Sequence, residues 1–527
     1  MQACESLDSR YIPNVLRLIR EHRRFFLAGI LAALALRLLF FVYFPELTDD
    51  SRSYADIAAN WLHHGIYGQT QGTKIVPTDT RLPGYPAFLA AIFFFFGANF
   101  RAVMFTQILV DVGSCLVIAD MARRAASERA SRIAFLLAAL CPFLANYSAA
   151  ELTETLEIFF TALALDGAIA ALNRIGGPCR TSHSTALDQT SMKLWAATGA
   201  AIAACILLRP DGGILLGAVA LYLAGLTFIA WLPNPKNCHP GRSEGSASWP
   251  AHARSKQASR SLLVAVIIVS ACALAPLVPW TIRNFHTLHH FQPLAPRYAN
   301  ESDETAPRGF NRWVSTWIVD YVSVEEVYWY VPGARIDPQK LPSRALENSH
   351  EKNATLALIA DYNQEQDLTP ELDDRFGQLA ASRIRAHPLR CYIALPLLRV
   401  ADMWLRPRTE MLPPDPRWWE FNDDPEHSIT AVGFGLLNLV YVVAALLAVV
   451  RRGPRTASRE PGNRGSSLCF IGPGLRWSGL LVGFVLLRSA FLLTLENPEP
   501  RYTLECYPVV IVCAAAYLAR DRTAAAI

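Results

Sequence analysis

Two adjacent carboxylates stand out because they follow directly on the first long apolar run. Asp49 and Asp50 lie in the stretch Leu47–Tyr54, just past the apolar run 25–44. A carboxylate costs free energy near hydrocarbon, so one that is kept there is a candidate for function. The alternative is that both acids only mark the point where a helix leaves the bilayer.

Other acidic and basic residues stand at the ends of later apolar runs. Arginine binds phosphate oxygens through two parallel hydrogen bonds, and a carboxylate of suitable pKa takes a proton from an attacking hydroxyl. Carboxylates beside arginines at one membrane face therefore indicate a site for a phosphorylated lipid and a hydroxyl acceptor. Alternatively, each cluster is an ordinary polar helix cap. The clusters contain Asp79, Arg81, Glu151, Glu154, Arg209, Asp211, Arg283, Glu499, Arg501 and Tyr502.

The composition places the chain among integral membrane proteins. Of its 527 residues, 52% are hydrophobic and only 18% are charged, and the mean hydropathy is +0.21. Soluble domains carry about 25% charged residues. The net charge is +4, and no nucleic-acid partner is expected. Eleven cysteines are scattered without a CxxC pair, so neither a zinc site nor a disulfide framework is indicated.

Basic loops predict the orientation of the apolar runs. Four arginines between residues 17 and 24 put the N-terminus in the cytoplasm, so Asp49 and Asp50 lie outside. Arg37 interrupts the first run and either faces the bundle interior or reaches to the interface. The loop before residue 83 is predicted outside and the basic loop after residue 119 inside, so only one of the two apolar pieces between them crosses. The shorter, proline-led piece 83–97 is therefore predicted to be a half-embedded helix. The predicted spans are 25–44, 101–119, 131–147, 152–172, 194–208, 213–231, 261–280, 429–450, 475–495 and 506–519.

The predicted fold is therefore an all-α polytopic membrane protein with about 10–11 membrane helices, outer-face loops and interfacial helices. A short helix within 53–65 and an amphipathic piece, 389–405, are expected at the membrane surface. The stretch 233–260, rich in Pro, Ser and Gly, is interpreted as a disordered insertion. The aromatic residues of 281–428 are interpreted as membrane-interface residues rather than sugar-stacking ones. The predicted parts are a cytoplasmic segment 1–24, a core 25–280 with its first outer loop 45–82, a large outer segment 281–428, and C-terminal membrane helices 429–527.

Several short motifs together resemble the GT-C glycosyltransferases. They are Asp50-Ser-Arg-Ser-Tyr54, Arg81-Leu-Pro-Gly-Tyr-Pro86, Leu152-Thr-Glu-Thr155, Leu208-Arg-Pro-Asp-Gly212 and Pro500-Arg-Tyr502. The chain is most similar to the group of protein O-mannosyltransferases and aminoarabinose–lipid A transferases. The resemblance covers 25–280 and 475–519 and is weaker over 281–428.

The resemblance implies a sugar donor on a polyprenyl phosphate and an inverting transfer to a hydroxyl acceptor. Asp50 would be the general base by its spacing to Tyr54, and Asp49 is the neighbouring candidate. Arg81, Arg209 and Arg501 would hold the leaving phosphate, with Arg283 as a further candidate, and Glu154 would order the acceptor or the loop. Tyr54, Asp211 and Tyr502 belong to the same predicted substrate site. Some of these relatives have a strict Asp-Glu pair where this chain has Asp49-Asp50, followed by Ser51.

No nucleotide is expected, and the cofactor is otherwise unknown because some relatives use a divalent metal and some do not. The sequence contains no recognisable metal-ligand constellation. The expected partners are the lipid-linked donor, a glycan, lipid or protein acceptor, and membrane lipids. A bacterial inner membrane with the site facing the periplasm is predicted. Two alternatives remain at this point: a transporter or flippase of a lipid-linked sugar, and an O-antigen-type ligase or polymerase.

Overall fold

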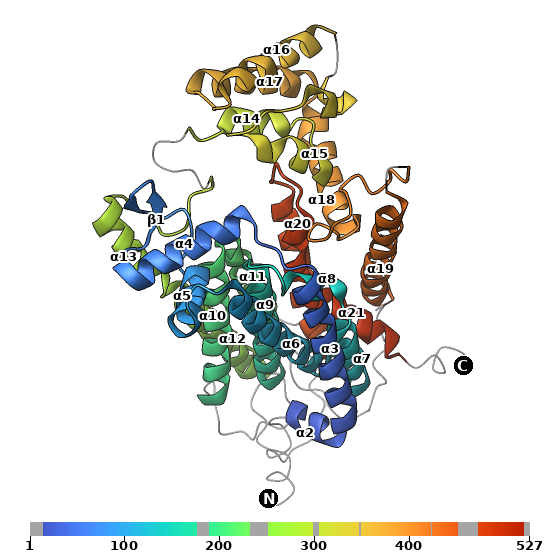
Figure 1. Cartoon of the computed structure of the whole chain (residues 1–527). Helices are drawn as coiled ribbons and strands as arrows, with labels where there is room; N and C mark the ends of the chain where they lie inside the picture. Colours follow the sequence, from blue (N-terminus) through green and yellow to red (C-terminus); the bar gives the residue numbers. More distant parts are fainter. Residues whose placement is uncertain are drawn as a thin grey trace, which may run out of the picture.

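The computed structural model is an all-α membrane protein, which confirms the predicted fold class. Long helices pack side by side beneath a smaller group of helices, α14 to α18, which are called the outer helices below (Figure 1). The structure describes residues 14–175, 189–231, 251–298, 305–346, 349–422, 424–451 and 473–520. Within these ranges the one sheet is an antiparallel hairpin of β1 (Gly68–Gln71) and β2 (Lys74–Pro77).

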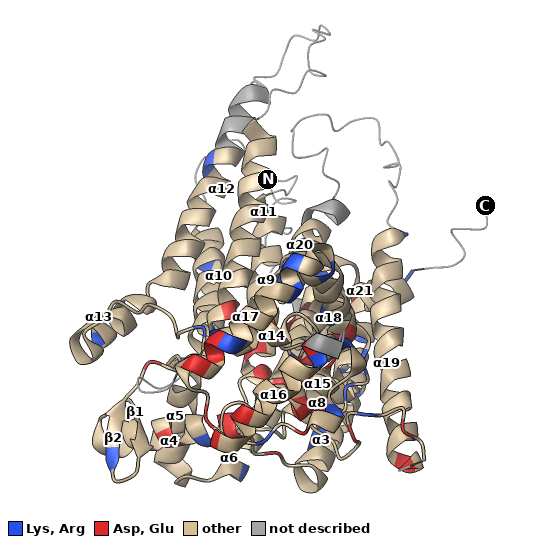
Figure 2. Ribbon diagram, turned by 90° about the horizontal axis from the view of Figure 1, so that it is seen from above, with Lys and Arg blue, Asp and Glu red and all other residues tan. Residues whose placement is uncertain are grey.

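Seven helical segments of the described chain are long and apolar enough to cross a membrane. Seen from above, α11 (Gly213–Trp231) carries no charged residue, whereas acidic and basic residues gather towards the middle of the molecule (Figure 2). The seven segments are α3 (Arg23–Tyr43), α6 (Phe100–Ala125), α9 (Glu154–Ile175), α10 (Gln189–Leu208), the turn η1 (Pro210–Gly212) with α11 (Gly213–Trp231), α12 (Ala251–Leu274) with α13 (Leu277–Leu288), and α19 (Pro425–Val450).

Other predicted apolar segments form shorter helices. The predicted half-embedded piece is α5 (Gly84–Phe96), and the two C-terminal segments are α20 (Pro473–Leu492), with its shorter apolar part Trp477–Leu492, and α21 (Tyr507–Leu518). The predicted span 131–147 is not one continuous helix, because the chain there forms α7 (Glu128–Ala139) and α8 (Pro142–Tyr147), and its crossing of the membrane stays a prediction. Proline has no backbone N–H and its ring clashes with the preceding turn, so Pro142 begins a new helix. The total number of crossings stays a prediction.

The prediction that 233–260 is a disordered insertion is wrong for the end of this stretch. Residues 232–250 lie outside the described residues, but α12 begins at Ala251, so the last ten residues belong to a helix. The short N-terminal helix α2 (Asn14–Glu21) precedes α3.

The segment 45–82, predicted as the first outer loop, contains α4 (Asp49–His64), which lies across the upper end of the bundle in Figure 1. The sequence predicts a helix within 53–65, and the structure starts it earlier. Thr48 caps the helix by accepting a hydrogen bond from the backbone N–H of Ser51, and the Ser51 hydroxyl accepts one from Thr48 N–H. Asp49 and Asp50 therefore form the first helical turn, where the helix dipole favours negative charge.

The outer helices have a hydrophobic core of their own. Trp313 and Trp317 are fully buried in it, so interpreting these two as membrane-interface residues is wrong. The predicted amphipathic piece forms the π-helical turn η6 (Arg390–Ala394) and α18 (Leu395–Leu405), which expose Leu397 and Leu398. The remaining elements here are α14 (Arg308–Val314), α15 (Tyr321–Glu326), the 3₁₀ turns η3 (Tyr328–Tyr330), η4 (Pro338–Lys340) and η5 (Ser343–Ala345), α16 (Ser349–Glu365), α17 (Pro370–Ala386), and, near the C-terminus, η8 (Pro500–Cys506).

Arg37 faces the interior of the helical bundle and stabilises the break between α7 and α8. Its Nε lies 2.7 Å from Oδ2 of Asp111, and both side chains are buried. Its terminal nitrogens donate to the backbone carbonyls of Ala138 and Ala139, at the end of α7. The Ala138 carbonyl also accepts a hydrogen bond from the backbone N–H of Cys141, so the buried arginine adds donors at a helix end as well as neutralising Asp111.

Replacing Arg37 with Met should strongly destabilise the protein, because Asp111 would keep a buried charge without its partner. Breaking such a pair costs about 3–5 kcal/mol. The double variant Arg37→Met/Asp111→Leu should recover part of this loss. The thermal unfolding midpoint of the purified protein in detergent measures both effects. A double variant no more stable than Arg37→Met would contradict the ion-pair explanation.

Candidate active site

A cavity of about 700 Å³ opens at the upper end of the bundle, where α4, α9, α11 and the chain around η8 meet. Its wall is polar on the side of α4 and η8 and partly apolar towards α11 and α20, where Ile214 and Phe491 line it. The cavity brings together most of the residues predicted from the sequence. These are Asp50, Tyr54, Arg81, Glu154, Arg209, Asp211, Arg501 and Tyr502.

The two adjacent acids have different environments. The Asp50 carboxylate lines the cavity, 2.8 Å from Nη2 of Arg81 and 3.6 Å from Nη2 of Arg501, and its side chain is 36% exposed. The Asp49 side chain is 99% exposed and pairs only with Arg52, on the same helix. Of the two, Asp50 has the geometry of a site residue.

The surrounding arginines also set the protonation state of Asp50. Burial raises its pKa, but the positive charges of Arg501, Arg81 and Arg209 outweigh burial and hold the pKa below its usual range. Asp50 is therefore a carboxylate at neutral pH, the form that can accept a proton.

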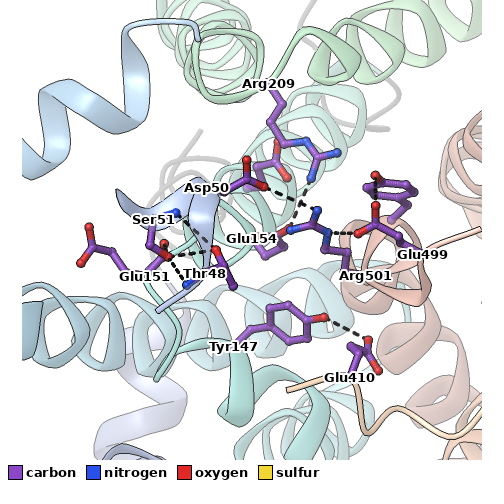
Figure 3. A network of polar contacts seen from close by, with 12 residues as sticks. Thr48, Asp50, Ser51, Tyr147, Glu151, Glu154, Arg209, Glu410, Glu499 and Arg501 are labelled. Carbon is purple, nitrogen blue, oxygen red and sulfur yellow. Dashed lines mark hydrogen bonds and ion pairs between the residues drawn. The ribbon is translucent and has the colours of Figure 1, made fainter. Parts of the chain in front are cut away.

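Arg209 and Arg501 meet at Glu154, which is almost fully buried at the start of α9 (Figure 3). Nη1 of Arg209 lies 3.3 Å and Nη1 of Arg501 3.7 Å from Oε1 of Glu154. Arg501 also pairs with Glu499 at 2.6 Å, and both guanidinium groups lie over the ring of Tyr502. Burial lowers the pKa of Arg501, but Glu499 and Glu154 outweigh it and raise that pKa, so the guanidinium stays charged.

The motifs around Arg81 and Arg209 each contain a glycine at a position where there is no room for a side chain. A Cβ on Gly84 would lie 2.6 Å from the carbonyl of Leu207, and a Cβ on Gly212 would lie 2.5 Å from the carbonyl carbon of Cys205. Both glycines permit close approach to the end of α10. The segments that carry Arg81 and Arg209 are thereby held against the same helix end.

Arg283 does not line the cavity. Its Nη1 donates to the carbonyl of Thr78 at 2.7 Å, and Nη2 donates to the carbonyl of Tyr67. The same guanidinium lies over the rings of Tyr67 and Trp280. In the structure Arg283 thus fixes both ends of the β1–β2 hairpin, and the chain that leaves this hairpin leads to Arg81.

Glu151 also lies near the cavity but points away from the arginines (Figure 3). It is fully buried, and neither carboxyl oxygen has a hydrogen-bond partner. Burial raises the pKa of Glu151 to about 8, so its carboxyl is mostly protonated at neutral pH. Its backbone carbonyl accepts a hydrogen bond from the Ser51 hydroxyl at 2.8 Å, which ties the start of α4 to this segment.

Sequence reasoning missed a second group of charges behind Arg209. Arg488 of α20 is fully buried and lies 2.7 Å from both Asp211 and Glu505. Glu157, one turn after Glu154, lies 3.7 Å from Arg209. Arg488, in the middle of the apolar run 475–495, was a signal that could have identified this group.

Ligand atoms of Glu157, Asp211 and Glu505 lie within 4.8 Å of one another, so the three acids could hold a metal ion. However, Arg209 already pairs with Glu157 and Asp211, and Arg488 pairs with Asp211 and Glu505, so two cations of the chain already neutralise these carboxylates. The donor set therefore assigns no metal a role in the chemistry of the cavity.

One part of the chain matches a known family. The model of the dolichyl-phosphate-mannose–protein mannosyltransferase family matches residues 79–174, which include Arg81 and Glu154. This match confirms, over those residues, the resemblance to the mannosyltransferase group that the sequence motifs indicate. Comparison with curated proteins gives no match.

Solved structures of two membrane glycosyltransferases are similar at low identity. The oligosaccharyltransferase AglB of Archaeoglobus fulgidus, with an inhibitory peptide and dolichol-phosphate, has a TM-score of 0.48 and 13% identity, over 95% of this chain and 50% of AglB. ArnT of Cupriavidus metallidurans in the apo state has a TM-score of 0.35 and 15% identity, over 90% of this chain and 77% of ArnT. The chain thus spans about half the length of AglB. At these TM-scores neither likeness assigns a role to any residue of this chain.

Replacing Glu151 with Gln should make stability less dependent on pH. A carboxyl whose pKa rises from 4.5 to about 8 on folding costs stability as the pH rises between these values, because the unfolded chain loses its proton first. The penalty reaches at most about 5 kcal/mol. The unfolding midpoint of Glu151→Gln should therefore be close to that of the wild type at pH 5 and above it at pH 8.5. Parallel pH profiles of the two proteins would contradict the buried-carboxyl assignment.

Proposed function

We propose that the chain transfers a sugar from a polyprenyl-phosphate donor to a hydroxyl acceptor at the outer face of the membrane. The observation that carries the proposal is the placement of Asp50, a cavity-lining carboxylate, beside Arg81 and Arg501. A carboxylate accepts protons and arginines bind phosphate, so the cavity offers both functions that such a transfer needs. The family match supports a donor carried on a lipid phosphate.

The reaction is a single displacement with inversion. The acceptor oxygen forms a bond to the anomeric carbon, and the bond from that carbon to the phosphate oxygen breaks. Its electron pair leaves with the phosphate, whose added charge Arg81, Arg209 and Arg501 stabilise. The acceptor proton passes to Asp50 and then to solvent. The products are the glycosylated acceptor and the free polyprenyl phosphate.

The shape of the cavity suits an amphiphilic donor. The arginines line its polar part, while Leu82, Ile214 and Phe491 contribute apolar wall. An isoprenoid chain along this wall would remain in contact with apolar surface while its phosphate reaches the arginines. Glu154 holds Arg209 and Arg501 in place, and Tyr502 supports both guanidinium groups from one side.

The function can be tested by incubating membranes that contain the protein with radiolabelled polyprenyl-phosphate sugars. Transfer of label to a hydroxyl-bearing product supports the proposal, and the labelled product identifies the acceptor. Movement of the lipid across liposome membranes without a glycosylated product would indicate a flippase instead. Transfer of a whole glycan from a pyrophosphate carrier would indicate a ligase or polymerase.

Replacing Asp50 with Asn should lower the transfer rate by about 10²–10⁴-fold, because the acceptor hydroxyl loses its base. Asp49→Asn is the matched control, since this neighbour is solvent-exposed and should keep a rate close to that of the wild type. Rates are compared in the labelled-sugar assay at equal amounts of folded protein. Full activity of Asp50→Asn would exclude the proposed base.

A further inference from the structure

The charges that line the cavity are balanced without any ligand. Four carboxylates face four guanidinium groups, so the cavity has no net positive charge to attract a phosphate. The eight residues are Asp50, Glu154, Asp211, Glu496, Arg81, Arg209, Arg297 and Arg501.

Each of these arginines already has a carboxylate partner. Arg81 pairs with Asp50 at 2.8 Å and Arg297 with Glu496 at 2.6 Å. Arg209 pairs with Glu154 and Asp211, both at 3.3 Å. Arg501 pairs with Glu499, Glu154 and Asp50. A phosphate that binds the N–H groups used in these pairs therefore takes the place of a carboxylate.

Asp50 is the carboxylate that can give way at least cost. Its side chain is 36% exposed, whereas Glu154, Asp211 and Glu496 are 3%, 12% and 16% exposed. A buried carboxylate that loses its partner keeps an uncompensated charge, but an exposed one is solvated instead. Asp50 also stands in the first turn of α4, where backbone N–H groups continue to stabilise its charge.

We propose that the donor phosphate displaces Asp50 from Arg81 and Arg501, and that Asp50 becomes free to accept the acceptor proton only after the donor has bound. The inference rests on the proposed function and adds an order of events to it. Arg501 is then a positioning residue as well as a phosphate ligand, because it holds Asp50 in the empty cavity and releases it in the occupied one.

The exchange also improves Asp50 as a base. The arginines hold the pKa of Asp50 below its usual range, which weakens its ability to take a proton. A phosphate between them neutralises part of their positive charge, so the pKa of Asp50 rises when the donor arrives. The same arginines thus suppress the base before binding and bind the phosphate afterwards.

The test measures equilibrium binding of undecaprenyl phosphate to the purified full chain in detergent micelles, without any acceptor. If Asp50 competes with the phosphate, Asp50→Asn should bind about three- to tenfold more tightly than the wild type. Asp49→Asn should bind like the wild type, because its exposed carboxylate touches none of the four arginines. Undecaprenol, which lacks the phosphate, should bind equally to all three proteins.

A double-mutant cycle separates competition from a general structural effect. Arg501→Gln should weaken binding, and the gain from Asp50→Asn should shrink in the Arg501→Gln background, since one of the two shared partners is gone. Equal or weaker binding by a folded Asp50→Asn variant would overturn the exchange while leaving the phosphate site intact. Failure of the wild type itself to bind undecaprenyl phosphate would instead overturn the proposed function, and the exchange with it.

Discussion

The upper end of this molecule depends on the neutralisation of buried arginines. Arg488 is fully buried in α20 and pairs with Asp211, which follows α10, and with Glu505 in η8. Arg209 extends the network to Glu154 and Glu157 of α9. Removing one member would leave a buried charge uncompensated, at a cost of about 3–5 kcal/mol. Segments that are far apart in the sequence are therefore held together, and the arginines of the cavity are fixed before any ligand arrives.

A second buried ion pair supports the chain segment that holds the first turn of α4, which contains Asp50. Arg37 and Asp111 support the end of α7, and α8 then leads the chain to residues 149–151. This short segment pairs with Glu46 and accepts the hydrogen bond of Ser51, so it fixes the first turn of α4. The orientation of Asp50 thus depends on an interaction deep between the helices, which the residues around Asp50 do not reveal.

Much of this arrangement could be predicted from the sequence, because apolar length and basic loops are local properties. They identified the long helices and the polar clusters between them. Contacts between distant segments were not accessible in the same way. Nothing in the spacing of Arg283 showed that it would bind backbone carbonyls of a hairpin rather than face the cavity. Trp313 and Trp317 were assigned to an interface because composition cannot distinguish an interfacial aromatic residue from one in a hydrophobic core.

The pairing of Asp50 with arginines combines two groups that weaken each other. A carboxylate among guanidinium groups is a poor base, because their charge stabilises the form that has lost its proton. Guanidinium groups with carboxylate partners are poor phosphate ligands, because those partners must first be displaced. A bound phosphate removes both disadvantages at once. It pairs with the arginines in place of Asp50, and the Asp50 carboxylate is then free to contact solvent and the acceptor. Pairing with arginines therefore keeps Asp50 a weak base while the cavity is empty, and makes its function as a base depend on the bound donor.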